Sequence, residues 1–462
     1  MLKKSVIADV LHKALSTGGD FAEIFGEDTV SNTIALIDGK VDQISSGRIY
    51  GVGIRILQGT RSVYAFTNDL SRDSLLDAAA KASVALSVSG RNQADTIQLE
   101  ERIHPNIHPV MLVPSSVHAS KKIKVLRDIH QAAKSHSPEI AQVIARMLDQ
   151  DQQVMIANSE GLFTEDRRVR TRIVGQAIAS NGTENQVGYK APGRHMGFEM
   201  YSQLIDVSEL GREAAETAVT MLHAPYAPAG QMQVVIDNEF GGVIFHEACG
   251  HSLEATSVAK GTSEFTGKLG EMIAAPCVTA IDDATIPFGW GSQNIDDEGM
   301  PTRKNVLIEN GILKSYLIDR LNGRRMGMES TGSGRRESYQ LSPTSRMSNT
   351  YIANGEHTCQ DIIASVDHGF YAKKLGGGSV DPATGEFNFA VLEGYMIKDG
   401  AVENPVRGAS LIGKGSEILK RIDMVGDNLD FGTGMCGSES GSIPAFVGQP
   451  MIRVSSMTVG GK

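Results

Sequence analysis

The stretch His223-Ala-Pro-Tyr-Ala-Pro-Ala-Gly230 separates two parts of this 462-residue chain that differ in their sequence patterns. Prolines and a glycine so closely spaced are typical of a linker. Helical and strand-like patterns alternate before it, whereas hairpin signals dominate after it and long helical patterns become scarce. The sequence therefore predicts an α+β fold, with an N-terminal α/β region over 1–225 and a C-terminal region over 226–462 built on a large, mainly antiparallel β-sheet.

The region before the linker combines helical patterns with strand pairs. Apolar residues at helical spacing, such as Val6, Val10 and Leu11, predict helices at the N-terminus and over about 71–86, 116–134 and 208–222. Turns between strands are expected at Asp38-Gly39, Gln58-Gly59 and Glu160-Gly161. A connector with three prolines, 97–114, allows two subdomains, near 1–96 and 115–225.

The region after the linker carries the strongest antiparallel signals. Val306–Glu309 and Ile312–Ile318 flank Asn310-Gly311, and Val391–Ile397 leads into Asp399-Gly400. Asn-Gly and Asp-Gly favour the two-residue turns of β-hairpins because both central positions adopt positive φ angles.

Composition excludes several classes of protein. The formal net charge is −10, with no global basic footprint for nucleic acid, and no apolar run is long enough to cross a membrane. The first residues lack the apolar core of a signal peptide. The four cysteines are scattered and are expected to be reduced thiols. The sequence thus predicts a cytoplasmic protein without direct contact to nucleic acid or membrane.

The strongest chemical signal is Asn238-Glu-Phe-Gly-Gly-Val-Ile-Phe-His246-Glu247-Ala-Cys-Gly-His251-Ser-Leu-Glu254, which follows an apolar strand. Zinc hydrolases often carry H-E-x-x-H, in which two histidines share a helix face beside a general base. Here one residue more separates His246 from His251, which on a regular helix turns the second histidine about 140° away from the first. A π-bulge, or a helix that breaks at Gly250, would bring the two together.

The spacing alone leaves two questions open. The histidines could simply lie at a helix end, with Glu247 a solvated helix charge. A catalytic zinc needs a third protein ligand. On chemistry alone the candidates are Glu254, Cys249, Cys277, Cys359, Cys436, His357 and His368.

Two further patterns compete for a functional interpretation. Gly408-Ala-Ser-Leu-Ile-Gly-Lys-Gly415 approaches a phosphate-binding loop, but glycine stands where the Mg²⁺-ligating hydroxyl should be. We interpret it as a glycine-rich turn before a helix at 416–421. An arginine cluster is expected to form either a mobile loop that grips a peptide or a solvated loop; it comprises Arg320, Arg324, Arg325, Arg335 and Arg336.

Several motifs together resemble the TldD/PmbA family. They occur in the family's order and span nearly the whole chain: Phe21-Ala-Glu-Ile, Gly51-Val-Gly-Ile-Arg-Ile-Leu, the His246–Glu254 motif, Gly334-Arg-Arg-Glu-Ser-Tyr339, Arg346-Met-Ser-Asn349, Gly376-Gly-Gly-Ser-Val-Asp381 and the Cys436 loop ending in Gly448-Gln-Pro450. TldD-like subunits carry H-E-x-x-x-H, whereas their PmbA (TldE)-like partners lack it. This chain therefore resembles the catalytic branch.

The resemblance implies a zinc-dependent peptidase that acts on unfolded proteins or short peptides. It implies His246, His251 and Cys436 as ligands of one Zn²⁺ and Glu247 as the catalytic base. It also implies a homodimer, or a heterodimer with a PmbA (TldE)-like subunit. The alternative is a non-catalytic modulator or binding subunit with a structural metal, which would not need Glu247.

The sequence departs from the family pattern at two places. The residues after Cys436, Gly-Ser-Glu-Ser-Gly, lack an expected Lys and Gln, and Phe389-Ala-Val391 replaces a more polar segment. These differences bear on substrate preference and partner choice, not on the chemistry.

Overall fold

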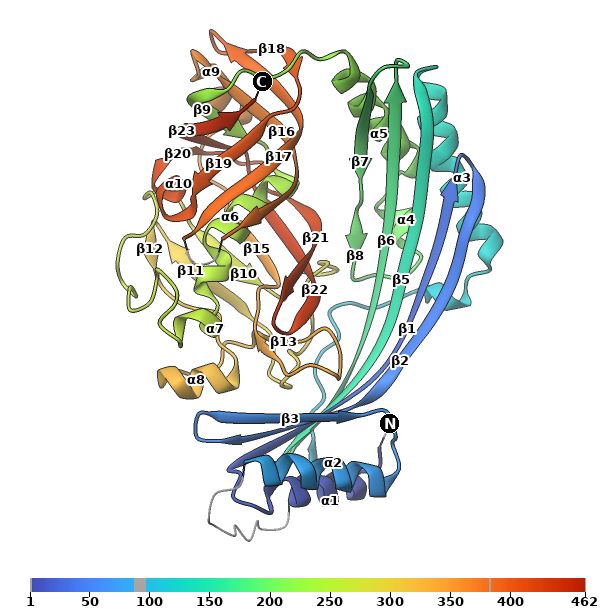
Figure 1. Cartoon of the computed structure of the whole chain (residues 1–462), viewed down its shortest axis with the longest axis vertical. Coiled ribbons are helices and arrows are strands. Elements are labelled where there is room, and N and C mark those ends of the chain that lie inside the picture. The colour runs from blue at the N-terminus through green and yellow to red at the C-terminus, as the bar shows by residue number, and fades with distance from the viewer. Residues whose placement is uncertain (1, 87–96, 382–383, 462) are drawn as a thin grey trace.

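One sheet of long antiparallel strands organises the N-terminal part of the molecule (Figure 1). The computed structural model describes residues 2–86, 97–381 and 384–461. The strand order is β3-β2-β1-β5-β6-β4, and β7 and β8 also pair with β6. Its strands are β1 (Phe21–Ile37), β2 (Lys40–Gln58), β3 (Arg61–Thr67), β4 (Glu100–Glu101), β5 (Ile140–Asn158), β6 (Leu162–Ser180), β7 (Asn185–Lys190) and β8 (Gly193–Arg194).

The turns of this sheet confirm the hairpin predictions. Asp38 and Gly39 join β1 to β2 with φ angles of 48° and 72°, as a two-residue hairpin turn requires. The sequence suggested two separate strand pairs, one at each of the turns Asp38-Gly39 and Gln58-Gly59. In the structure, β2 runs without interruption from the first turn to the second and belongs to both pairs. Because β1 pairs with β5 along nearly its whole length, the sheet also crosses the proposed boundary between the two subdomains. The division into domains stays a prediction.

Helices cover different parts of this sheet. Helices α1 and α2 share a core with β1 and β2, whereas α3 and α5 pack farther along β5 and β6. Apolar residues at helical spacing, such as Val10 and Leu11 in α1, supply these cores. The helices are α1 (Lys4–Leu15), α2 (Arg72–Ala85), η1 (Pro114–Ser116), α3 (Ala119–His136), α4 (Met200–Gln203) and α5 (Val207–His223).

The C-terminal part contains two large sheets rather than one, while the α+β class is confirmed. One has the order β12-β11-β10-β15-β22-β21. The other has the order β16-β9-β23-β19-β17-β18, with β20 on β23 and a further pairing of β16 with β17. Their strands are β9 (Gly230–Ile236), β10 (Ala280–Asp283), β11 (Lys304–Glu309), β12 (Ile312–Leu313), β15 (Asn349–Ile352), β16 (His368–Val380), β17 (Glu386–Lys398), β18 (Ala401–Val406), β19 (Ser410–Lys414), β20 (Ile422–Val425), β21 (Asp430–Ser438), β22 (Gly441–Gln449) and β23 (Ile452–Gly460).

Short helices and one small strand pair complete this part. The pair is β13 (Gly334–Arg335) with β14 (Thr344–Ser345). The helices are η2 (Glu239–Gly242), α6 (Val243–Ala248), η3 (Gly250–Leu253), α7 (Ala255–Val258), α8 (Arg320–Met326), α9 (Cys359–Ala364) and α10 (Gly415–Arg421).

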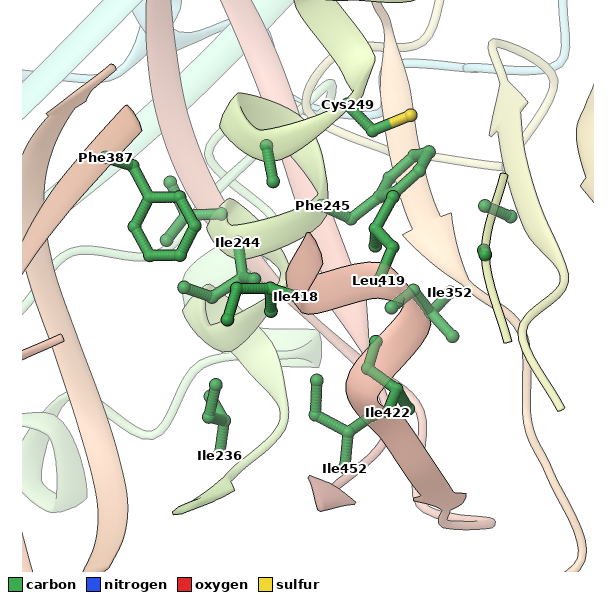
Figure 2. Packing of buried hydrophobic residues seen from close by; sticks show 14 of the residues in the cluster. Ile236, Ile244, Phe245, Cys249, Ile352, Phe387, Ile418, Leu419, Ile422 and Ile452 are labelled. Carbon is green, nitrogen blue, oxygen red and sulfur yellow. The ribbon is translucent and has the colours of Figure 1, made fainter. Parts of the chain in front are cut away.

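The core of the C-terminal part surrounds α6. Figure 2 shows Ile244 and Phe245 of this helix among apolar side chains that include Ile236, Ile418 and Leu419. Backbone also approaches it closely, because a Cβ at Gly415 would lie 1.9 Å from the carbonyl oxygen of Ala248. Close packing on these sides holds the helix, and with it the histidine motif, in one position.

The arginine cluster does not form a loop, so both interpretations of it were wrong. Arg320, Arg324 and Arg325 belong to α8, whereas Arg335 and Arg336 are buried. Arg336 donates to Glu23 of β1 at 2.8 Å and thereby joins the two parts of the chain. A buried charge needs such a partner because its desolvation would otherwise be costly.

No helix in the described part of the chain is long and apolar enough to cross a bilayer.

Candidate metal centre

The extra residue in the histidine motif is accommodated by a break in the helix. Helix α6 ends at Ala248, Cys249 leaves helical geometry with φ −138° and ψ −42°, and His251 lies in the following 3₁₀ turn η3. A Cβ at Gly250 would lie 2.2 Å from Sδ of Met347, so any larger residue there would require the Met347 side chain to move. The sequence predicted either a π-bulge or a break in the helix at Gly250, and the structure shows a break at this place.

The break brings both histidines to one cysteine. Nε2 of His246 lies 3.2 Å from Sγ of Cys436, and Nε2 of His251 lies 3.3 Å from the same sulfur. Cys436 comes from β21, the edge strand of the six-stranded sheet. Among the described residues, these three form the group whose donor atoms all lie within 4.8 Å of one another.

Oxygen atoms hold the other nitrogen of each imidazole ring. Nδ1 of His246 lies 3.1 Å from Oγ1 of Thr350 on β15, and Nδ1 of His251 lies 3.2 Å from Oε2 of Glu254. Such contacts fix the orientation of metal-binding histidines and leave Nε2 available. The sequence argument did not find Thr350, since nothing in its local pattern sets it apart.

Glu247 lies beside the group. Its Oε2 is 3.7 Å from Nε2 of His251, and its side chain is 22% exposed. His246, by contrast, is buried. Glu247 and His251 are thus the partly exposed members of this site, whereas His246 and Cys436 are buried.

The charges in the group favour a thiolate. Burial raises the pKa of Cys436, but the neighbouring His246 and His251 outweigh it and lower that pKa to about 3. Burial lowers the pKa of His251, yet Glu254 and Cys436 raise it well above its usual value. A deprotonated sulfur between two imidazoles is the form in which cysteine binds metals.

The other candidate ligands do not join this group. Cys249 is buried in the apolar core, where desolvation raises its pKa, and Cys277 is exposed. Nδ1 of His357 lies 3.2 Å from the carbonyl oxygen of Val425. Cys359 begins α9 and His368 begins β16. Glu254 reaches the group only through Nδ1 of His251.

The glycine-rich stretch 408–415 is neither a phosphate-binding loop nor a turn. Residues Ser410–Lys414 form β19, which pairs with β17 on one side and β23 on the other. Because these residues form a paired strand, our interpretation of the stretch as a glycine-rich turn was wrong. The helix that follows, α10, was predicted correctly.

Models of one protein family match most of the chain, including the segments that carry the histidine motif and Cys436. Residues 22–86, 113–222 and 229–461 match the models for domain 1, the central domain and the C-terminal domain of the PmbA/TldA metallopeptidases. The chain belongs to the PmbA/TldD metallopeptidase family, in its TldD-like branch.

Relatives in this family are named metalloproteases. The chain is 35% identical over 456 residues to the metalloprotease TldD homolog of Haemophilus influenzae, an alignment that covers 96% of this chain and 93% of that one. It is 23% identical to the zinc metalloprotease TldD homolog of Saccharolobus solfataricus, with coverages of 98% and 99%.

Solved structures of the same fold cover nearly the whole chain. A modulator of a DNA gyrase from Thermotoga maritima superposes with a TM-score of 0.79 at 21% identity, covering 95% of this chain and 96% of that one. TldE from Thermococcus kodakarensis gives 0.75 at 18% identity, with coverages of 99% and 100%. At such low sequence identities, the similarity to these two structures shows a shared fold and nothing more.

Proposed function

We propose that this TldD-like chain is a zinc-dependent peptidase that hydrolyses unfolded proteins or short peptides. The observation that carries the proposal is the convergence of His246, His251 and Cys436 beside the partly exposed carboxylate of Glu247. Three protein ligands and an accessible fourth position are the pattern of a catalytic zinc site, whereas structural sites are closed. The name of the Saccharolobus solfataricus relative supports zinc in particular.

The donor set fits zinc in chemistry and in spacing. Zinc binds imidazole nitrogen and thiolate sulfur at bond lengths that place two tetrahedral ligands about 3.5 Å apart. The two nitrogen-to-sulfur distances of 3.2 and 3.3 Å are close to this value. Nε2 of each histidine faces the sulfur of Cys436, and the low pKa of Cys436 favours its thiolate form.

In the proposed mechanism, each of these residues has its own role in peptide hydrolysis. Zinc, when bound, lowers the pKa of a water and polarises the scissile carbonyl. Glu247 takes the proton from the attacking water and delivers it to the nitrogen of the leaving amine. His246, His251 and Cys436 hold the ion, and Thr350 and Glu254 hold the two imidazoles in position.

We infer that the active form is a dimer, either of this chain or with a PmbA (TldE)-like subunit. The structural likeness to TldE supports a partner with the same fold. An active site enclosed between two subunits would admit an extended chain and exclude a folded domain.

Metal analysis together with digestion of an unfolded protein, with and without a chelator, tests the proposal. Purified protein should contain about one zinc per chain and cleave the substrate, and the chelator should abolish cleavage until zinc is returned. Stoichiometric zinc without any cleavage would instead favour the alternative, a modulator or binding subunit with a structural metal.

A further inference from the structure

Arg346 is a buried cation that binds the turn carrying Cys436. Its side chain is fully buried. Nη2 donates to the carbonyl oxygen of Cys436 at 2.5 Å, while Nη1 donates to Oγ of Ser440 at 3.0 Å and to the carbonyl oxygen of Gly441 at 2.9 Å. One guanidinium thus holds β21, the start of β22 and the turn between them.

The other side of the same guanidinium faces the segment that carries His251. Nε of Arg346 lies 3.7 Å from Oε1 of Glu254 and has no hydrogen-bond partner. Glu254 in turn contacts His251 through Oε2. Arg346 therefore contacts the backbone of one proposed ligand, Cys436, and faces Glu254, which contacts another proposed ligand, His251. The two ligands are 185 residues apart in the chain.

We propose that Arg346 is a positioning residue that holds Cys436 and, through Glu254, His251 in the arrangement that zinc requires. The inference rests on the proposed zinc site. Its physical basis is the fork of the guanidinium, whose donors point in fixed and different directions. The ammonium of a lysine can bind one or two of these acceptors but cannot span the turn and face Glu254 together.

The positive charge of Arg346 also stabilises the surroundings of the proposed site. The guanidinium donates to the backbone carbonyl of Cys436 on one side and faces the buried carboxylate of Glu254 on the other, so its charge offsets part of the desolvation cost of that carboxylate. In the described part of the chain, the contacts of the guanidinium are with the turn of Cys436 and with Glu254, and not with either imidazole or with Glu247. The guanidinium can therefore stabilise the site without blocking access to it.

The test compares zinc affinities of full-length variants by competition with a chromophoric chelator. Arg346→Lys keeps the charge and loses the fork, and Arg346→Met loses both. Arg170→Lys is the matched control, because Arg170 is also buried and donates to backbone carbonyls, those of Trp290 and Ser292, neither of which belongs to a proposed ligand or to Glu254. Thermal unfolding of the zinc-free proteins measures the structural cost of each change.

We expect Arg346→Lys to weaken zinc binding about 10–100-fold, the usual effect of losing a residue that orients ligands, and Arg346→Met to weaken it more. Arg170→Lys should bind zinc like the wild type even where it unfolds at a lower temperature. Cobalt-substituted Arg346→Lys should also show an altered thiolate-to-cobalt absorption band. Should Arg346→Met fail to fold, the lysine variant decides the outcome.

Wild-type zinc affinity and an unchanged cobalt band in Arg346→Lys would overturn the inference. An equal loss of affinity in Arg170→Lys would overturn it too, because the effect would then be general destabilisation. The same measurements on the wild type distinguish a failure of the proposed function from a failure of this inference. A wild type that binds zinc but cleaves nothing refutes the peptidase and leaves the role of Arg346 standing, whereas a wild type that binds no zinc refutes both.

Discussion

Oε2 of Glu254 lies 3.2 Å from Nδ1 of His251, while its second oxygen accepts a hydrogen bond from the backbone N–H of Met347 at 3.2 Å. Both oxygens of this carboxylate are thus engaged on the protein side of the histidine. Nε2 of His251 is left free toward Cys436. Glu254 therefore orients a proposed ligand and is not placed to be one.

This arrangement predicts different outcomes for two substitutions. Cys436→Ala should lose zinc and activity together because it removes a ligand, whereas Glu254→Ala should keep most of its zinc because it removes only an orienting contact. Zinc content of the purified variants, measured by atomic spectroscopy, checks both. Full zinc occupancy in Cys436→Ala would move the third ligand elsewhere, with Glu254 the first residue to examine.

Glu247→Gln should separate metal binding from chemistry. The amide cannot accept the proton of the attacking water, so peptide hydrolysis should fall by about 10²–10⁴-fold while zinc stays near one per chain. Initial rates on an unfolded protein, with zinc content measured on the same sample, provide the comparison. Glu271→Gln, at an exposed position, is the control and should behave as wild type. Wild-type cleavage by Glu247→Gln would refute the assigned base.

Zinc should protect Cys436 from alkylation. The low pKa of its thiol makes it a reactive thiolate once the metal is removed, whereas a bound metal occupies the sulfur. Mass spectrometry after iodoacetamide treatment, with and without chelator, reports each cysteine separately. Cys277 is exposed and should react in both states, and the fully buried Cys249 should react in neither. Equal labelling of Cys436 in both states would contradict its role as a ligand.

The enzyme should prefer unfolded chains. If the active site is enclosed in a dimer, a native domain must open before it can enter, so a pre-unfolded version of the same substrate should be cleaved much faster. One protein offered in native and reduced, unfolded forms makes the comparison direct. Equal rates on the two forms would exclude a restrictive entrance.

A pair of stacked histidines should make stability depend on pH. The rings of His108 and His195 are buried with centroids 4.2 Å apart. Burial, aided by the nearby Arg170, lowers the pKa of His108 to about 4 and that of His195 well below its usual value. The unfolded chain therefore binds more protons than the folded one between about pH 4 and pH 6.5, and stability is lost as pH falls through that range.

For His108 alone the loss amounts to about 3 kcal/mol when the pH falls from 6.5 to 4. The double variant His108→Asn with His195→Asn should flatten this dependence because asparagine does not titrate. Its amide can still accept from the backbone N–H of Phe288, as Nδ1 of His108 does, and contact the carbonyl oxygen of Ser292, as Nδ1 of His195 does. Thermal unfolding midpoints at about pH 5 and about pH 7.5 test the expectation. His136→Asn, exposed at the end of α3, is the control and should keep the wild-type difference. An unchanged pH dependence in the double variant would show that other groups dominate.

Local patterns in the sequence were sufficient for much of the fold. The helix at Lys4–Leu15 and the turn at Asp38-Gly39 follow from apolar spacing and from the φ angles that each residue allows. The uninterrupted β2 and the two separate C-terminal sheets were not predicted. Strand pairing joins residues far apart in the chain, and no local pattern records which strands become neighbours.

The sequence by itself determined the α+β class, the histidine motif with its acid, and the resemblance to the PmbA/TldD family, because these depend on residue type and short-range spacing. Only the tertiary structure decided that the helix breaks at Cys249, that Cys436 and not Glu254 lies beside both Nε2 atoms, and that Arg346 lies behind them. The physical reason is the same in each case. A ligand group needs donor atoms within a few ångströms of one another, and here the packing of α6 against β15 and β22 brings His246 to Cys436, 190 residues away in the chain.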